Sequence, residues 1–451
     1  MNQMKSVALH NLGCKVNGYE MDVMQQMLRE RDYKIVPFDE RADIYIVNTC
    51  TVTNIADRKS RQMLHRAKKK NPEAVVVAVG CYVQTGGEDA LKDEGVDLAI
   101  GNNRKKDLVE ILERFLEERE CRQNGEEDIY SLKTLRHTTI IDIAKAGEFE
   151  NMELKETHGH TRAYVKIQDG CNQFCSYCII PYARGRVRSR REEDILREVG
   201  GLAARGYKEV VLTGIHISSY GTDRGGPELL RLVRAIHGTE GIERIRLGSL
   251  EPGIVTEEFA EELRKLPKVC PHFHLSLQSG CDATLKRMNR RYTAGEYYEK
   301  TKILRRIFDD PAITADVIVG FPGETEEEFA ETAAFLEKIR FYEMHVFKYS
   351  RRKGTRAAAM DGQVGDETKA ERSGILLAME RVHSREFRER ILGREQEVLF
   401  EEEKNIDGTL FQTGHTRQYV KVAKKSEKSL TNELILGKIK GFLSDDMMLI
   451  E

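Results

Sequence analysis

Residues 166–181 read Lys166-Ile-Gln-Asp-Gly-Cys171-Asn-Gln-Phe-Cys175-Ser-Tyr-Cys178-Ile-Ile-Pro181. The spacing Cys-x3-Cys-x2-Cys lets three thiols, here called the loop trio, reach one metal centre from a single loop. Three thiolates are one ligand short of the four that a cubane iron–sulfur cluster or a structural zinc takes. Because no His or fourth Cys follows within the loop, we expect a substrate or cofactor as the fourth ligand. A zinc loop or three buried thiols is the less favoured alternative.

Length and composition predict a multidomain chain without a membrane segment. A chain of 451 residues is too long for a single hydrophobic core, and this length predicts two to four domains. The first residues lack a basic region followed by a long apolar run, and no apolar stretch reaches the length of a membrane span. We therefore predict a cytoplasmic protein with no membrane contact. In a reducing compartment its nine cysteines are metal ligands or core thiols rather than disulfides.

The first third of the chain alternates predicted strands and helices. Apolar runs at 5–9, 43–47, 74–79 and 96–100 predict four strands, and helical patterns lie between and after them. Alternation of this kind is typical of α/β proteins. We therefore predict a flavodoxin-like parallel sheet in a domain at 1–120.

Three further cysteines follow the ends of predicted strands. Cys14, Cys50 and Cys81, here called the strand-end trio, each come directly after the apolar part of a strand. Because the carboxyl ends of parallel strands share one edge of a sheet, where ligands gather, we expect these thiols to converge. Glycines beside Cys14 and Cys81 would let the backbone approach a bulky cluster closely. The alternative is three separately buried cysteines.

The middle of the chain repeats the alternation of strands and helices. A charged connection at 121–158 contains a β-prone run at 138–143 that could pair with a neighbouring strand, and Cys121 lies in its polar part without a predicted role. About six strand–helix units then fill a domain at 159–385. Six units predict a partial TIM-type barrel, whose active site lies at the C-terminal ends of the strands.

The last part of the chain predicts a small β domain. A charged helix at 368–392 leads into five short β-rich runs separated by polar turns, and we place this domain at 386–451. Five such strands predict a small antiparallel β-barrel. Barrels of this kind often bind RNA. The alternative is a purely structural cap, since the acidic run at 401–403 offsets much of the basic charge.

The whole chain resembles the methylthiotransferases of the radical S-adenosylmethionine (SAM) superfamily. Leu-Gly-Cys14, Asn-Thr-Cys50, Gly-Cys81 and the loop trio occur in the order of that family, and Tyr177 precedes the third loop cysteine. The resemblance implies a methylthiotransferase domain, a radical SAM domain and an RNA-binding TRAM domain with an OB-like barrel. Members modify a ribosomal-protein aspartate or an adenosine beside the tRNA anticodon that carries threonylcarbamoyl or isopentenyl.

Two segments favour one branch of this family. The segments 12–17 and 48–61 are most similar to the tRNA threonylcarbamoyladenosine methylthiotransferases, whereas the other branches usually carry different residues after the first two cysteines. The resemblance thus implies conversion of N6-threonylcarbamoyladenosine at tRNA position 37 to its 2-methylthio derivative. The alternatives are methylthiolation of isopentenyladenosine in tRNA or of a ribosomal-protein aspartate.

The resemblance also implies two [4Fe–4S] clusters and SAM as cofactors. The loop trio would hold the cluster that binds SAM, and one electron would then cleave SAM to a 5′-deoxyadenosyl radical. That radical would take hydrogen from C2 of the modified adenine. The strand-end trio would hold an auxiliary cluster whose open iron carries a sulfur, which is methylated and delivered to carbon. An electron donor such as flavodoxin or ferredoxin is therefore expected.

Other residues are assigned to the cofactor on weaker grounds, with ordinary turn chemistry as the alternative. Thr213-Gly214-Ile-His216 lies where the family contacts the SAM amino group, although the usual Gly-Glu pattern is altered here. Asp169 beside the loop trio is a candidate catalytic residue for substrate or sulfur handling. The remaining candidates for cofactor binding or packing are Tyr177, Ser249, Glu251, Gln278 and Val319.

The net charge of −2 does not indicate a nucleic-acid partner. Any such prediction must rest on local clusters of basic residues. Basic residues cluster at 58–70, 184–191, 287–291 and 351–356. If several of these runs share one face, they would bind the phosphates of a tRNA anticodon arm. We expect a monomer. An enzyme acting on a protein side chain and a non-catalytic iron–sulfur carrier or RNA-binding protein are the other classes of function; no role is predicted for Cys270 or Cys281.

Overall fold

The computed structural model describes residues 4–87, 95–123, 140–157 and 161–451. The first domain contains a five-stranded sheet in the order β2-β1-β3-β4-β5, and every pair in it is parallel. This order confirms the flavodoxin-like prediction. β2 is a strand that the sequence pattern did not predict, because its three residues, one exposed and two half-buried, give no clear alternation. The strands are β1 (Ser6–Asn11), β2 (Lys34–Val36), β3 (Ile44–Thr49), β4 (Val75–Gly80) and β5 (Leu98–Ile100).

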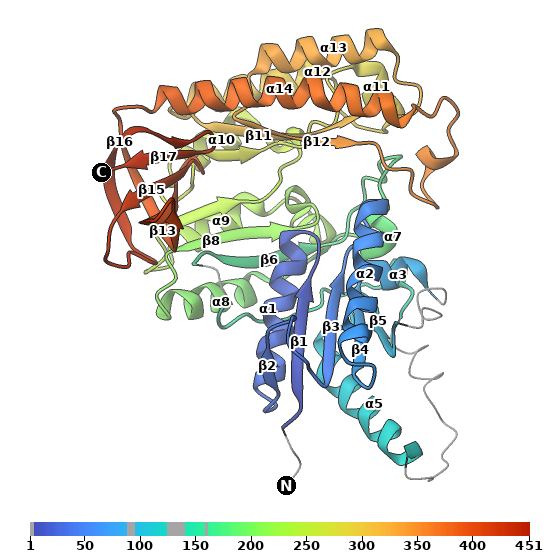
Figure 1. Cartoon of the computed structure of the whole chain (residues 1–451). Helices are drawn as coiled ribbons and strands as arrows, with labels where there is room; N and C mark the ends of the chain where they lie inside the picture. The colour runs from blue at the N-terminus through green and yellow to red at the C-terminus, as the bar shows by residue number, and fades with distance from the viewer. Residues whose placement is uncertain (1–3, 88–94, 124–139, 158–160) are drawn as a thin grey trace.

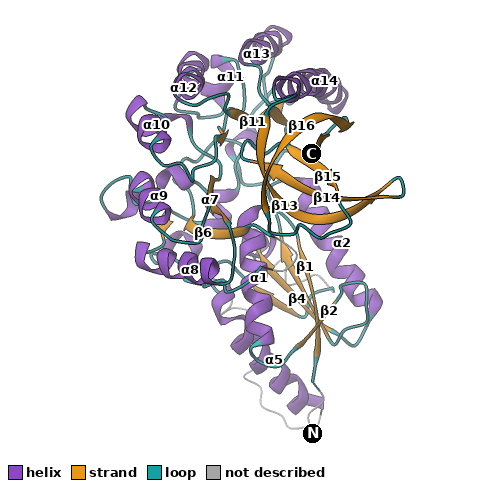
Figure 2. Cartoon of the chain, turned by 90° about the vertical axis from the view of Figure 1, so that its left-hand side faces the viewer, coloured by secondary structure: helices purple, strands orange, loops and turns teal. Residues whose placement is uncertain are grey.

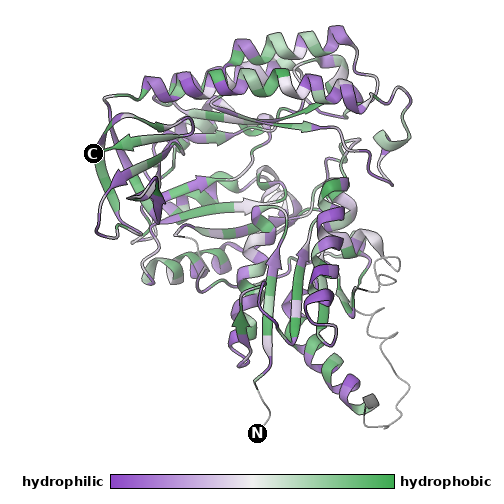
Figure 3. Cartoon of the chain, viewed as in Figure 1, coloured by the Kyte–Doolittle hydropathy of each residue, from purple (hydrophilic) through white to green (hydrophobic). Residues whose placement is uncertain are grey.

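Helices cover both faces of this sheet. Every residue of β3 and β4 is buried, as expected for central strands of a parallel sheet with two covered faces. Separate hydrophobic clusters lie on the two faces, one packed by α1 and α5 and the other by α2. Figure 3 shows apolar residues along the strands and mostly hydrophilic residues along α2. The helices are α1 (Lys15–Arg29), α2 (Asn54–Lys70), α3 (Cys81–Gly86) and α5 (Leu108–Gln123).

The connection to the second domain is only partly described. The predicted β-prone run at 138–143 lies partly outside the described residues, and its described part is not a strand. Instead the chain forms a 3-10 helix at Ile143–Lys145, where Asp142 accepts a hydrogen bond from the backbone of Ala144. That cap offers the backbone a local partner in place of a neighbouring strand. The strand expectation was therefore wrong for the described part.

The second domain contains the six predicted strands in the predicted order. A four-stranded sheet has the order β7-β6-β8-β9, and a three-stranded sheet has the order β10-β11-β12. The two are joined by isolated parallel bridges, among them Leu250 to Leu275. The expected single partial barrel is thus two sheets joined at one edge. The strands are β6 (Ala163–Asp169), β7 (Arg188–Ser189), β8 (Glu209–Gly214), β9 (Arg244–Leu247), β10 (His272–His274), β11 (Ala312–Val319) and β12 (Glu343–Lys348).

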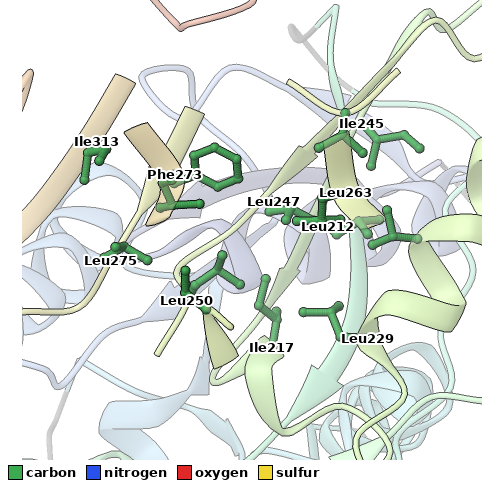
Figure 4. Close-up of a cluster of buried hydrophobic side chains, with 14 of the residues drawn as sticks. Leu212, Ile217, Leu229, Ile245, Leu247, Leu250, Leu263, Phe273, Leu275 and Ile313 are labelled. Atoms are coloured by element: carbon green, nitrogen blue, oxygen red, sulfur yellow. The ribbon is translucent and has the colours of Figure 1, made fainter. Parts of the chain in front are cut away.

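An outer layer of helices covers these sheets. Figure 2 shows α8, α9, α10 and α12 one above another along one side of the molecule, with α11 and α13 beside them at the top. Between helices and strands lies the largest hydrophobic cluster, part of which is drawn in Figure 4. The helices are α7 (Ile180–Arg184), α8 (Glu192–Ala204), α9 (Leu229–His237), α10 (Glu257–Arg264), α11 (Asp282–Arg287), α12 (Ala294–Ile307) and α13 (Glu326–Ile339).

The C-terminal strands form a closed barrel in the order β13-β14-β15-β17-β16. All five predicted strands are present, but β15 and β17 pair in parallel, so the barrel is not wholly antiparallel. Arg244 of β9 fastens the barrel to the second domain through an ion pair of 2.9 Å with Glu397. The strands are β13 (Glu395–Ile406), β14 (Thr409–Thr416), β15 (Lys421–Lys425), β16 (Leu434–Ser444) and β17 (Met447–Ile450).

Two long helices cross the predicted domain limits. α5 extends to Gln123, so Cys121 lies on a helix and not in an irregular connection. The helix α14 (Asp366–Arg390) runs from the second domain to the barrel (Figure 1). The limits at 1–120, 121–158, 159–385 and 386–451 stay predictions. None of the described helices is long and apolar enough to cross a membrane.

Candidate functional site

The strand-end trio gathers at the carboxyl edge of the first sheet. Cys14 is the N-cap residue of α1, Cys50 follows β3, and Cys81 begins α3 directly after β4. Gly13 has a φ of +106°, and a Cβ there would lie 3.1 Å from the Sγ of Cys50. The chain therefore needs glycine at this position, both for its conformation and for its close approach to Cys50.

The thiols of this trio influence one another. Burial raises the pKa of Cys50 to about 11, and the charges of Cys81 and Cys14 add to that shift. Cys14 is exposed to solvent, yet surrounding protein also raises its pKa. The structure thus brings the three predicted cysteines close to one another.

The loop trio is held by a short, heavily bonded loop after β6. Backbone bonds fix the loop at both ends, from the N–H of Cys171 to the carbonyl of Gly185 and from the N–H of Ser176 to the carbonyl of Met288. Gly170 has a φ of +73°, and a Cβ there would lie 1.8 Å from the carbonyl oxygen of Arg186. Burial raises the pKa of Cys171 to about 11 and that of Cys178 to about 12.

Neither trio has the dimensions of a single-ion site. Within the described ranges, three His, Cys, Asp or Glu ligand atoms lie within 4.8 Å of one another only at His274, Asp316 and His345, on the neighbouring strands β10, β11 and β12. A tetrahedral zinc, about 2.3 Å from each sulfur, needs sulfurs roughly 3.8 Å apart. Both cysteine trios are more open, which suits a cluster in which each thiolate binds a different iron.

A buried arginine joins the first site to the second domain. Arg184, the last residue of α7, donates from Nε to the Sγ of Cys81 at 3.3 Å. Its other nitrogens contact Asn17 and Glu20 of α1, each at 2.5 Å, and Asp169 of β6 at 3.2 Å. Burial opposes ionisation of Glu20, but Arg184, Lys105 and Lys166 together hold its pKa well below the usual range.

A second buried arginine lies at the loop trio. Arg290 donates from Nη1 to the Sγ of Cys175 at 3.2 Å and forms an ion pair of 2.8 Å with Glu251. Burial opposes ionisation of Glu251, but the nearby His216 and the charge of Arg290 hold its pKa below the usual value. The ring nitrogen Nε2 of His216 lies 3.6 Å from Glu251. Two predicted cofactor residues are therefore close to the loop trio.

The other predicted cofactor residues lie at strand ends on the same side. Thr213 and Gly214 end β8, and Ser249 is exposed just after β9. Gln278 adopts a φ of +78°, an unfavourable conformation for a side chain of its kind, and its backbone bridges to Val317. Val319 ends β11 and is fully buried in the hydrophobic core.

Tyr177 and Asp169 have well-defined surroundings. The Tyr177 ring lies edge-on to Phe321, with ring centroids 6.4 Å apart. The carboxylate of Asp169 accepts a bond of 2.8 Å from the backbone of Gly170 and an ion pair of 2.6 Å from Lys166. Burial opposes its ionisation, but the cations around it lower its pKa. These contacts occupy both of its oxygens.

One segment after β12 contacts both cysteine sites. Arg352 donates to Thr51 at 2.7 Å and pairs with Asp57 at 2.7 Å, both residues of the first domain just after Cys50. Arg356 then donates to the carbonyl of Phe174 within the loop trio at 3.3 Å. The segment therefore fixes the first domain against the loop that carries the second site.

The basic runs differ in exposure. The run at 58–70 is mostly exposed on α2, and the segment 351–356 lines an open basic cavity of about 680 Å³. The run at 184–191 was wrongly grouped with them, because Arg184, Arg188 and Arg190 are each no more than 2% exposed. A dense run of arginines suggests a solvated face, but here Arg184, Arg188 and Arg190 are buried beside the carboxylates of Glu20, Asp169 and Glu198.

Two family models and several known proteins match this chain. Residues 165–336 match the model of the radical SAM superfamily, and residues 6–101 match that of the uncharacterized protein family UPF0004. The chain is 38% identical to the threonylcarbamoyladenosine tRNA methylthiotransferase MtaB of Bacillus subtilis over 97% of this chain and 94% of that protein. The chain belongs to the radical SAM methylthiotransferase family.

Other relatives also align with most of this chain. The MtaB protein of Aquifex aeolicus is 40% identical over 89% of this chain and 94% of its own length. The tRNA-2-methylthio-N(6)-dimethylallyladenosine synthase of Acetivibrio thermocellus is 36% identical over 96% of this chain and 88% of its own length. Among solved structures, the radical SAM methyltransferase TsrM of Kitasatospora setae matches with a TM-score of 0.52 at 15% identity, covering 77% of this chain and 72% of that one, which shows the fold.

Sequence patterns did not reveal several residues of this site. Arg184 and Arg290 were grouped with basic runs, and Glu20 was one acidic residue in an amphipathic helix. A usable signal for Arg184 was its position six residues after Cys178, whereas Arg290 is more than 100 positions from the loop trio and had no such signal. No sequence signal marked Arg352, whose partners lie about 300 positions away.

Proposed function

We propose that this chain converts N6-threonylcarbamoyladenosine at position 37 of tRNA to its 2-methylthio derivative, as a tRNA-2-methylthio-N6-threonylcarbamoyladenosine synthase. The enzyme transfers methylthio groups to tRNA by radical SAM chemistry. The observation that carries the proposal is the pairing of two cysteine trios across one domain interface in a chain that is 38% and 40% identical to two MtaB proteins.

The cofactors are two [4Fe–4S] clusters and SAM. In the proposal the strand-end trio and the loop trio each hold one cluster, and both donor sets fit, because each offers three thiols and one buried arginine that donates to a sulfur. When bound, these groups supply a 5′-deoxyadenosyl radical for the hydrogen at C2 of adenine and a sulfur with its methyl group for the resulting carbon radical.

The chain's own residues bind and orient these groups. In the proposal Thr213, Gly214 and His216 contact the SAM amino group, and Ser249 and Glu251 contact the ribose. Tyr177, Gln278 and Val319 pack the rest of SAM. Glu251 is already ionised and held by Arg290, so its acceptor atoms are fixed before SAM arrives. Asp169 acts through its ion pairs, since its oxygens are engaged by Gly170 and by cations.

The proposed tRNA surface combines α2 with the segment 351–356. The exposed cations Arg58 and Lys59 lie on the first turns of α2, and Asn54 at its start donates to the backbone of Arg351. Phosphates of the anticodon arm would bind along this face, and the affinity would fall with salt. We also propose a cytoplasmic monomer that receives electrons from a flavodoxin or ferredoxin.

The proposal is tested by mass spectrometry of tRNA nucleosides from cells that lack this protein. Loss of 2-methylthio-N6-threonylcarbamoyladenosine, restored by the wild-type chain and not by Cys50→Ala, is the expected result. Loss of the methylthio form of isopentenyladenosine would instead assign the enzyme to the second candidate, which the 36% identity to a dimethylallyladenosine synthase favours. Unchanged tRNA would overturn both.

A further inference from the structure

The interface between the first two domains buries an unusual number of charges around Arg184. Lys166 of β6 contacts Glu20 at 2.7 Å and Asp169 at 2.6 Å, and Lys105 also pairs with Glu20. Arg188 lies 3.9 Å from Asp169, and two of its nitrogens have no hydrogen-bond partner within the described residues. The network consists of Glu20, Lys105, Lys166, Asp169, Arg184 and Arg188, each no more than 3% exposed.

The charges of this network do not balance. Four cations, Lys105, Lys166, Arg184 and Arg188, face two carboxylates, Glu20 and Asp169. The nearby Glu150 is also buried and accepts a hydrogen bond from the backbone N–H of Lys106. Even with Glu150 ionised, the network keeps one positive charge without a buried counter-ion among the described residues. Burying an uncompensated charge costs several kcal/mol per ion.

A thiol of the strand-end trio lies beside this excess positive charge. The Nε of Arg184 points to the Sγ of Cys81 at 3.3 Å, and the side-chain amide of Asn102 also approaches that sulfur, at 3.5 Å. Three thiolates around a [4Fe–4S] core give an anionic group, and reduction makes it more negative. A fixed guanidinium with a hydrogen bond to one thiolate both compensates this charge and stabilises the reduced form.

The second site has the same kind of donor in a different setting. Arg290 approaches Cys175 at 3.2 Å, but it is balanced by its own ion pair with Glu251. Its charge is therefore already compensated within the second domain. Arg184 comes from the second domain and serves a thiol of the first, so the strand-end trio receives its cation from across the interface.

We propose that Arg184, supported by this buried network, is the positioning residue and counter-charge for the cluster at the strand-end trio, and that Arg290 has the corresponding role at the loop trio. The proposal rests on the proposed function only in assigning a cluster to each trio. It predicts that each arginine sets the reduction potential of one cluster and not of the other. Loss of either charge makes its own cluster harder to reduce.

The test is a redox titration of the full-length holoenzyme monitored by electron paramagnetic resonance. Addition of SAM changes the signal of the cluster that binds it, which separates the two signals. We expect Arg184→Met to shift the potential of the SAM-insensitive signal to more negative values and Arg290→Met to shift the SAM-sensitive one. Arg188→Met, which removes a network cation without a sulfur contact, should give a smaller shift in the same direction as Arg184→Met.

Conservative variants keep the test decisive if a methionine variant does not load its cluster. Arg184→Lys retains the charge and is expected to bind both clusters with an intermediate potential, checked by iron content. Equal potentials in Arg184→Lys, Arg184→Met and wild type, or equal shifts of both signals in either methionine variant, would overturn the proposal. The potentials are measured without tRNA, so a wrong substrate assignment would leave this result unaffected.

Discussion

The two cysteine sites are built in opposite ways. The loop trio comes from eight consecutive residues, and a glycine with positive φ and backbone bonds to neighbouring loops fix it. The strand-end trio comes from three strands, and its thiols meet only because those strands are parallel neighbours. A local site depends on its loop, whereas an assembled site depends on the whole sheet and, here, on an arginine of another domain.

The separate roles of the two sites are tested first by removing one thiol from each site. Cys175→Ala should abolish both 5′-deoxyadenosine formation and methylthiolation, because the loop trio would hold the cluster that binds SAM. Cys50→Ala should retain SAM cleavage and lose the methylthio product. Both products are measured by liquid chromatography and mass spectrometry on one reaction. Cys121→Ala, an exposed cysteine of α5, is the matched control. Loss of SAM cleavage in Cys50→Ala with the loop cluster loaded would contradict the division of roles.

The contribution of the buried interface network to stability is tested by Glu20→Gln. This change leaves Lys105, Lys166 and Arg184 without their shared carboxylate and should lower the free energy of unfolding by about 3–5 kcal/mol. Glu113→Gln removes an exposed pair with Arg31 and should cost about 0–1 kcal/mol. Denaturant unfolding measures both. Equal costs would show that the buried network does not hold the domains together.

The two sites should behave alike toward alkaline pH in the metal-free protein. Burial raises the pKa of Cys50 and of Cys171 from 9.0 to about 11, so each folded thiol stays protonated while the unfolded chain ionises. The sign follows: stability is present below pH 9 and is lost as pH rises from about 9 to 11, by roughly 2–3 kcal/mol for each thiol.

Serine variants separate the two contributions to this alkaline loss. Cys50→Ser and Cys171→Ser should each flatten the dependence of unfolding free energy on pH between 9 and 11, because serine does not ionise there. Cys121→Ser, for an exposed thiol, should leave it unchanged. A pH dependence that neither buried variant alters would refute the link between burial of these thiols and alkaline instability.

The smallest expected effect concerns the surface beside the first site. Lys59→Ala on α2 should weaken tRNA binding a few-fold and lower the slope of log affinity against log salt by about 1. Lys265→Ala, on the distant helix end after α10, should change neither. Filter binding over a salt series measures the slope. An equal effect of both changes would argue against a tRNA face on α2.

Much of the fold was predictable because its signals are local. The alternation of strands and helices predicted the flavodoxin-like sheet and the six strands of the second domain, and strand ends predicted where Cys14, Cys50 and Cys81 meet. Sheet closure was less predictable, because it depends on pairing between distant segments. The parallel pair β15–β17 and the join between β9 and β10 are examples.

The charged parts of the site could not be predicted for a related reason. Arg184 and Arg291 look alike in sequence, since both stand in basic runs, yet one is buried and the other exposed. What separates them is a partner elsewhere in the chain. Arg184 meets Glu20, more than 160 positions away, and no pattern within a short window carries that information.

The buried network also limits which domains of related proteins can be recombined into a functional chain. A recombination that joined the first 120 residues of one relative to the remainder of another would separate Glu20 and Asn17 from Arg184 and Lys166. Such a chimaera would keep most of each hydrophobic cluster, although Met152 and Leu154 of the first-domain cluster would come from the second parent. It would function only where the incoming segment restores the same charges. Domain shuffling in this lineage should therefore be rarer than the separate cores alone would allow.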